Sequence, residues 1–335
     1  MAVSSEPALL SVRNLSVMFA TEQGPVTAVD NLSFDLGAGE VLGLVGESGC
    51  GKSVTALSIM GLLPNPPGRI GGGQILFEGE NLLAKSRREM RRIRGSQISM
   101  IFQEPMTSLN PVFTIGDQLI ETIRWHERMG AAAARRRAVE MLDKVGIPSP
   151  GQRLDEYPHQ LSGGMRQRVM IAIALACTPA LLLADEPTTA LDVTIQAQIL
   201  DLLGTLQQEF KMAVILITHD LGVVAQFVDR VAVMYAGRLV ETGSVTDVFE
   251  RPTHPYTQGL LASIPSLEDE QDRLASIPGT VPDPFALPSG CRFQPRCGHA
   301  KSACSLAEPP LIECETAHAV ACIRPVGYRV GATVP

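Results

Sequence analysis

The chain has 335 residues, of which 45% are hydrophobic and 19% charged, so it can bury the core of one large domain and a smaller one. Its formal net charge of −7 argues against a nucleic-acid binder, which usually carries an excess of Lys and Arg. No stretch reaches the roughly 18–20 apolar residues that a membrane-spanning helix needs, and the first residues lack the basic start and apolar core of a signal peptide. We therefore expect a cytosolic protein for which any link to a membrane runs through a partner.

The first hundred residues predict a series of strands with one helix between them. Apolar and polar residues alternate from Leu10 to Phe19, which is typical of strands. A short apolar strand over 40–45 leads into a glycine-rich loop, and a helix begins near residue 51 and stops before Pro64. Residues 64–73 are rich in Pro and Gly, which predicts a surface loop, and residues 97–102 predict another buried strand.

The middle of the chain changes to helical periodicity. From about residue 104 to 178 apolar residues recur at helical spacing, which predicts a mostly helical insertion between core strands. Strands return at 180–185 and 213–218, with a long helix from about 193 to 210 between them. This alternation of strand and helix predicts a parallel sheet covered on both faces, and short strands between 231 and 240 complete it.

Beyond about Pro252 the character of the chain changes again, because prolines recur and regular periodicity fades. We expect a linker here that leads into a small appended domain built around cysteines. The predicted division places one domain at 1–250 and a C-terminal extension at 251–335.

Residues 46–53 read Gly-Glu-Ser-Gly-Cys-Gly-Lys-Ser and fit the phosphate-binding pattern G-x-x-x-x-G-K-[ST], between an apolar strand and a helix. Glycines allow backbone N–H groups to point at phosphate oxygens, and the helix N-terminus adds a favourable dipole. We expect Lys52 to reach the β and γ phosphates of ATP and the Ser53 hydroxyl to bind Mg²⁺. The predicted nucleotide-binding residues of this P-loop are Gly46, Ser48, Gly49, Cys50, Gly51, Lys52 and Ser53.

A pair of acidic residues follows the apolar run 181–184. Asp185, at the end of this predicted strand, is placed to hold Mg²⁺. Glu186, the next residue, is placed to polarise an attacking water as a general base. Together with the P-loop, this pair predicts an enzyme that hydrolyses ATP.

The run Leu161-Ser162-Gly163-Gly164 is similar to the signature of the ATP-binding cassette (ABC) ATPases. In that family two cassettes dimerise head to tail, and each signature closes on the ATP held by the opposite P-loop. Ser162, Gly163 and Gly164 would meet the γ-phosphate at the start of a helix. The resemblance implies an α/β fold of the ABC-type P-loop NTPases, with a parallel-sheet core, an antiparallel β subdomain and a helical subdomain at about 104–178.

The same resemblance implies roles for further residues. Gln103 resembles the glutamine that contacts Mg²⁺ and the attacking water, and it would act in catalysis. Asp192 resembles the loop residue that crosses the dimer interface, and His219 resembles the switch histidine that contacts the γ-phosphate. Phe19 is the best match to the aromatic residue that stacks on adenine, and a place in the strand core is an equally good interpretation.

Three segments, at 24–29, 161–169 and 251–257, look like the ATPase subunits of dipeptide and oligopeptide importers. The similarity runs from about residue 9 to 326. It implies an ATPase at the cytoplasmic face of the cell membrane that energises peptide import through two integral permease subunits. A sister ABC ATPase would complete the dimer, and a substrate-binding protein would act indirectly.

Other functions stay open at this point. Nickel importers share much of the pattern, so nickel or another small solute is an alternative substrate. An ABC protein that acts on DNA or the ribosome is less favoured, because the chain is acidic and lacks a long coiled-coil insertion.

Five of the seven cysteines lie between residues 291 and 322, in a proline-rich segment with little core of its own. A metal would stabilise such a segment, although the spacing matches neither zinc ribbons nor ferredoxins. The positions that resemble the peptide-importer family are Cys291, Cys297, Cys304 and Cys322, and the resemblance implies a [4Fe–4S] cluster on these four. Cys314 is a spare or substitute ligand, zinc and no metal are the alternatives, and His299 and His318 are expected at the surface.

Overall fold

The computed structural model describes residues 7–103, 108–189, 192–263 and 277–327. The chain divides into two compact units. One, named here the P-loop unit, comprises residues 10–35, 41–80 and 217–335. The other, named the signature unit, comprises residues 1–9, 36–40 and 81–216. Both contain parallel strands and helices, as the predicted α/β class requires.

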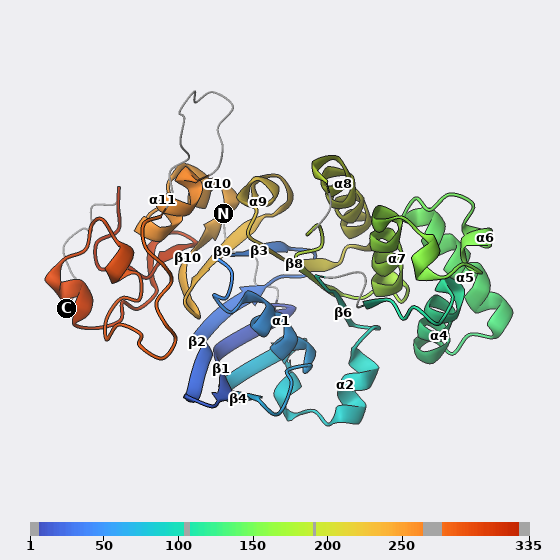
Figure 1. Cartoon of the computed structure of the whole chain (residues 1–335), viewed down its shortest axis with the longest axis horizontal. Helices are drawn as coiled ribbons and strands as arrows, with labels where there is room; N and C mark the ends of the chain where they lie inside the picture. The colour runs from blue at the N-terminus through green and yellow to red at the C-terminus, as the bar shows by residue number, and fades with distance from the viewer. Residues whose placement is uncertain (1–6, 104–107, 190–191, 264–276, 328–335) are drawn as a thin grey trace. The chain divides into compact units, whose positions relative to one another are not determined.

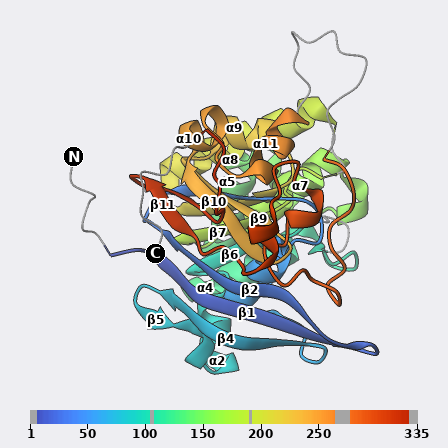
Figure 2. The same ribbon diagram turned by 90° about the vertical axis from the view of Figure 1, so that its left-hand side faces the viewer.

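The P-loop unit holds an antiparallel sheet in the order β2-β1-β4-β5. β1 runs antiparallel to β4 with Leu10 opposite Phe77 and Phe19 opposite Gly68, and Figure 2 shows the long strands β1 and β2 side by side. Its strands are β1 (Leu10–Thr21), β2 (Gly24–Leu36), β4 (Gly68–Phe77) and β5 (Glu80–Asn81).

The expectation of a loop at 64–73 is wrong from residue 68 onward, because these residues form the start of β4. Glycines occupy the strand where it crosses an irregular part of β1. Gly73 has a φ of +97°, and a Cβ there would lie 2.6 Å from the carbonyl oxygens of Arg13 and Asn14. Glycine therefore serves the close approach of two strands here, and not a turn.

A second group of strands in the P-loop unit carries the phosphate-binding loop. β3 (Val41–Val45) is buried along its whole length and runs parallel to β9 (Arg230–Tyr235), as expected for a strand covered on both faces. β9 pairs antiparallel with β10 (Arg238–Ser244), which pairs with β12 (His318–Val320), and β12 pairs with β11 (Ile312–Glu315). A hairpin of the C-terminal extension thus extends this group of strands beyond β10. The helices of this unit are α1 (Lys52–Met60), α9 (Leu221–Phe227), α10 (Val245–Glu250) and α11 (Pro255–Ala262), with 3₁₀ turns η3 (Gln294–Arg296) and η4 (Ser302–Ser305).

The signature unit combines three strands with a helical group. β6 (Ile98–Ile101) and β7 (Leu181–Asp185) are parallel, and β8 (Ala213–Thr218) lies next to β7. Figure 1 shows α4 to α7 gathered together, within the range predicted to be helical. The helical elements of the unit are η1 (Leu82–Ala84), α2 (Arg87–Ile93), α4 (Ile115–Glu127), α5 (Ala131–Lys144), α6 (Pro150–Arg153), η2 (Pro158–Gln160), α7 (Gly163–Leu175) and α8 (Val193–Phe210).

Helix ends in the signature unit follow local sequence signals. α2 and α4 each begin with a capping box, Ser86 with Glu89 and Thr114 with Asp117, which satisfies backbone N–H groups of the first turn. The helical group packs through a core of fully buried side chains. These include Leu119, Ile123, Ala138, Leu142 and Val169. Across the described residues, no helix combines the length and the apolar character that a membrane span requires.

Candidate nucleotide site and cysteine pocket

The P-loop connects β3 to α1 in a conformation that only glycine permits at its first residue. Gly46 has a φ of +148°, and a Cβ there would overlap the carbonyl oxygen of Met234 at the end of β9. The loop can therefore pass close to β9. Gly51 forms the N-cap of α1, where no side chain makes a capping hydrogen bond among the described residues. Backbone N–H groups at the N-terminus of a helix commonly bind anions, so the start of α1 suits a phosphate group.

Lys52 is buried, and its ammonium group lies against the backbone of the P-loop itself. The Nζ atom donates to the carbonyl oxygens of Gly46 at 2.6 Å and Glu47 at 2.9 Å. Ser48, Gly49 and Ser53 are exposed. Cys50 is buried, and its burial raises the pKa of the thiol, so its side chain takes part in packing.

Gln103, Asp185 and Glu186 come together at the carboxyl ends of the parallel strands β6 and β7. Gln103 Nε2 donates to Glu186 Oε2 at 2.9 Å, and the Thr189 hydroxyl donates to the same oxygen at 2.8 Å. Asp185 is buried at the end of β7. Glu186 has a φ of +46°, an unusual backbone conformation of the kind that clusters at functional sites.

The signature residues stand at exposed helix N-termini. Ser162 is the N-cap of α7, and its hydroxyl accepts from the Met165 N–H at 3.3 Å. Asp192 is the N-cap of α8, and its carboxylate accepts from the Ile195 N–H at 2.9 Å. Ser162, Gly163 and Asp192 are exposed, while Gly164 is half-buried. These groups are accessible to another molecule.

Two further predicted residues belong to the P-loop unit. His219 follows β8 and is exposed. Phe19 lies in β1, is half-buried, and pairs across the sheet with Gly68. Part of the Phe19 ring is therefore accessible to a ligand.

Four of the five C-terminal cysteines line one pocket, together with His254 and Phe293. They are Cys291, Cys297, Cys304 and Cys322, the four that the resemblance to the peptide importers implies. Burial raises the pKa of the Cys291 thiol to about 11 and also raises the pKa values of Cys297 and Cys322. Within the described ranges, no three His, Cys, Asp or Glu side chains are close enough to bind one metal ion.

Cys314 does not line this pocket. It is buried in β11, and its thiol donates to the His318 carbonyl oxygen at 3.2 Å. The expectation that His318 lies at the surface is wrong, because β12 places it against β10 with 1% of its surface exposed. Its Nε2 atom lies 2.8 Å from Glu241 Oε1. His299 is exposed, as expected.

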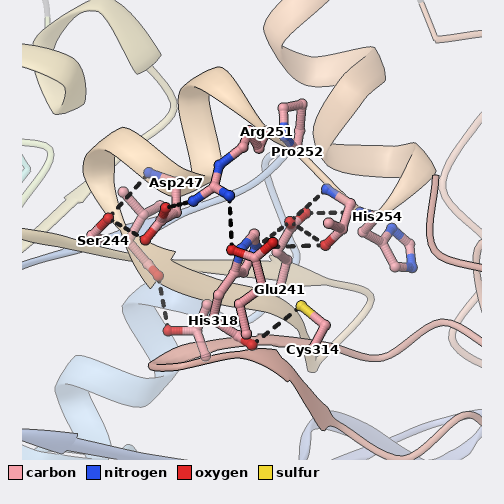
Figure 3. Close-up of polar contacts among 12 residues, drawn as sticks. Glu241, Ser244, Asp247, Arg251, Pro252, His254, Cys314 and His318 are labelled. Atoms are coloured by element: carbon pink, nitrogen blue, oxygen red, sulfur yellow. Dashed lines mark hydrogen bonds and ion pairs between the residues drawn. The ribbon is translucent and has the colours of Figure 1, made fainter. Parts of the chain in front are cut away.

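Glu241 is fully buried and organises a polar network that sequence reasoning missed (Figure 3). Its carboxylate accepts from the Thr253 N–H and hydroxyl, each at 2.7 Å, and from the His254 N–H at 3.0 Å. Burial by itself would raise the pKa of Glu241, but hydrogen bonds from His318 and Thr253 hold it below its usual value. The Pro-Thr-His-Pro run at 252–255 could have indicated an irregular segment next to Glu241, because proline interrupts regular structure.

The comparisons with known proteins agree with this geometry. The ABC transporter family model matches residues 29–189, and the model of the oligopeptide/dipeptide transporter C-terminal region matches residues 240–304. The dipeptide transport ATP-binding protein DppD of Bacillus subtilis (strain 168) is 55% identical over 94% of both chains. The chain belongs to the dipeptide and oligopeptide transport ATP-binding subunits of the ABC transporter family.

Other relatives of this ABC ATPase are similar to the same extent. The oligopeptide transport ATP-binding protein AppD of Bacillus subtilis is 53% identical over 94% of this chain and 96% of its own. The DppD protein of Escherichia coli (strain K12) is 53% identical over 91% and 93%. Among solved structures, an ATP-binding cassette in a dimeric post-hydrolysis state with ADP and phosphate has a TM-score of 0.63 at 29% identity, over 70% of this chain and 98% of that one. The fold is therefore that of an ABC-type P-loop ATPase.

Proposed function

We propose that this ABC ATPase hydrolyses ATP to drive the import of dipeptides and oligopeptides through separate membrane subunits. The observation that carries the proposal is the match of residues 240–304 to the oligopeptide/dipeptide transporter C-terminal region. That region lies outside the cassette match at 29–189, so its match supports peptide transport separately from ATP binding. The names of the DppD and AppD relatives support the same substrate class.

In this proposal the chain is a peripheral subunit at the cytoplasmic face of the membrane. It works with two permease subunits and a sister ATPase, and a substrate-binding protein delivers the peptide. The exposed N-termini of α7 and α8 support a dimer, because Ser162 and Asp192 are accessible there. The related cassette with ADP and phosphate is itself dimeric.

The proposed nucleotide contacts follow from the groups described above. Lys52 and the P-loop N–H groups hold the β and γ phosphates, Phe19 stacks on adenine, and His219 contacts the γ-phosphate. Ser53, Asp185 and Gln103 offer oxygen donors, which fit the ligand preference of Mg²⁺. Magnesium, when bound, would neutralise charge on the phosphates.

Glu186 is proposed as the general base of hydrolysis. Its carboxylate accepts two hydrogen bonds, from Gln103 and Thr189, and these fix its orientation. In the reaction it would take the proton of the water that attacks the γ-phosphorus, which breaks the bond to ADP. The signature of the sister subunit would close over the same phosphate.

The transport function is tested on the assembled importer. The chain is reconstituted with its permease subunits and binding protein in vesicles that contain ATP, and uptake of labelled dialanine is compared with uptake of labelled Ni²⁺. We expect ATP-dependent uptake of dialanine and none of Ni²⁺. Uptake of Ni²⁺ without dialanine would replace the peptide assignment with the nickel alternative and leave the ATPase assignment intact.

We also propose that the C-terminal extension at 251–335 binds a [4Fe–4S] cluster through Cys291, Cys297, Cys304 and Cys322. Support comes from the shared pocket of these four thiols and from the separate location of Cys314. Four thiolates match the ligand set of a [4Fe–4S] cluster, in which each cysteine binds a different iron.

The cluster is tested by purification without oxygen and measurement of iron, acid-labile sulfide and zinc. About four irons and four sulfides per chain are expected, as the [4Fe–4S] composition requires. Cys297→Ser should lower the iron content, whereas Cys314→Ser should leave it unchanged. One zinc per chain, or no metal, would overturn the proposal without affecting the ATPase assignment.

A further inference from the structure

Arg296 connects the cysteine segment, residues 291–322, to the P-loop. Its guanidinium forms two parallel bonds to the Glu47 carboxylate, Nη1 to Oε2 at 2.7 Å and Nη2 to Oε1 at 3.0 Å. Glu47 is the second residue of the P-loop, so this contact reaches the nucleotide-binding loop itself. Paired bonds of this type fix the orientation of both partners.

The surroundings of Arg296 hold its guanidinium group in one position. Only 5% of its side chain is exposed, and Nε donates to the Pro278 carbonyl oxygen at 3.0 Å. The guanidinium also lies over the ring of Tyr235, 5.8 Å from its centre. The bond to Glu47 raises the pKa of Arg296, which keeps the charge in place. A buried charge with these constraints has little freedom to find another carboxylate.

Tyr256 holds the backbone of the same P-loop residue. The Glu47 N–H donates to the Tyr256 hydroxyl at 2.9 Å, and the Glu47 carbonyl oxygen accepts from Lys52 at 2.9 Å. Tyr256 lies in α11 and is fully buried. The side chain, the N–H and the carbonyl of Glu47 are therefore all engaged, two of them by residues from beyond position 250.

The aromatic rings link these contacts to the cysteine pocket. Tyr235 and Tyr256 have ring centres 4.6 Å apart, and Phe293 lies 5.2 Å from Tyr235 and 5.4 Å from Tyr256. Phe293 itself lines the pocket of the four cysteines. A change in the packing of this pocket would thus reach the residues that hold Glu47.

We propose that Arg296 and Tyr256 are positioning residues for the P-loop. Through these two residues the cysteine segment sets the affinity of this ATPase for ATP. The bond to Glu47 holds the loop in the shape that its glycines allow, before nucleotide arrives. Without it the loop samples other shapes, and binding must select the competent one. The effect then falls on ATP affinity and not on the chemical step.

The test compares two buried arginines of one segment. Arg296→Met removes the partner of Glu47, whereas Arg292→Met removes an ion pair to Asp30 of β2 and leaves Glu47 untouched. The dissociation constant of Mg·ATP is measured on the full chain by fluorescence titration, with kcat and KM measured on the assembled importer. Arg296→Met should raise the dissociation constant and KM about 10-fold with kcat within about 2-fold, and Arg292→Met should change all three by less than about 2-fold.

A double-mutant cycle separates positioning from simple loss of stability. Glu47→Gln should raise the dissociation constant about as much as Arg296→Met, and the double variant should be no worse than either alone. Arg296→Lys, which keeps the charge and is the safer variant for folding, should retain part of the affinity.

Two results would overturn the proposal. One is an unchanged affinity in both Arg296 variants while thermal stability falls. The other is an equal loss of affinity in Arg292→Met, which would assign the effect to general anchoring of the segment.

Discussion

The P-loop and the cysteine segment belong to the same compact unit but are held by different kinds of interaction. The P-loop follows the buried strand β3 and ends at α1, and Lys52 bonds to carbonyl oxygens five and six residues before it. The cysteine segment has short 3₁₀ turns, and its Arg292 and Arg296 pair with Asp30 and Glu47, which lie 262 and 249 residues earlier. Lys52 is held by bonds within the P-loop itself, whereas the cysteine segment is anchored by long-range charge pairs, one of which reaches Glu47 of the P-loop.

This difference has a consequence for how each region fails. Removing a side-chain group that acts only on the substrate should leave the folding stability of the protein nearly unchanged. A region shaped by buried polar pairs is destabilised when one partner is removed, because the other is left desolvated. Three substitutions extend this comparison to the catalytic Glu186 and to Glu241 and His254 of the buried polar network, from the largest expected effect to the smallest.

Glu186→Gln removes the proposed base with little change in shape. We expect kcat to fall by about 1,000-fold while ATP binding and the midpoint of thermal unfolding stay close to the parent values. The measurement is single-turnover hydrolysis together with nucleotide titration. Glu209→Gln, in the surface ion pair with Lys144, is the matched control and should keep full turnover. Normal turnover in Glu186→Gln would show that another group is the base.

Glu241→Ala breaks the buried network through which β10 holds the start of the extension. Thr253, His254 and His318 lose their shared acceptor, and the free energy of unfolding should fall by about 3–5 kcal/mol in urea denaturation of the full chain. Glu315→Ala removes an exposed partner of Arg251 and should cost at most about 1 kcal/mol. Equal losses in the two variants would contradict the idea that burial makes the difference.

Acid should weaken the extension through His254. Its full burial lowers the pKa to about 4, from the usual 6.5. Between these two pKa values His254 is protonated in the unfolded chain but not in the folded chain. The stability present above pH 6.5 is therefore lost as the pH falls toward 4. The loss amounts to about 3 kcal/mol if the whole shift is realised.

The control for this titration keeps the helix cap. His254 is the N-cap of α11, and its Nδ1 atom accepts from the Tyr256 N–H at 3.1 Å. His254→Asn preserves an acceptor there without a titrating ring, so its stability should change less between pH 6.5 and 5, above the range in which Glu241 titrates. His299→Asn, at an exposed site, should behave like the parent. Identical pH profiles in all three would exclude His254 as the cause.

The strands and helices of the core could be predicted because their signals are local. The apolar run at 213–218 and the helical spacing at 193–210 coincide with β8 and α8. The prediction of a loop at residues 68–73 is wrong because glycines that serve close strand packing look the same in sequence as glycines of a turn.

By itself, the sequence determined the order of the nucleotide motifs, and its resemblance to the peptide importers implied the four cysteines that share a pocket. The nucleotide motifs are short runs of residues between predictable strands and helices, so they can be read along the chain. Tertiary structure alone decided that His318 is buried against Glu241 and that Arg296 meets Glu47. A charged residue carries no local signal of its partner, since the pair forms only when burial brings distant segments together and makes an unpaired charge costly.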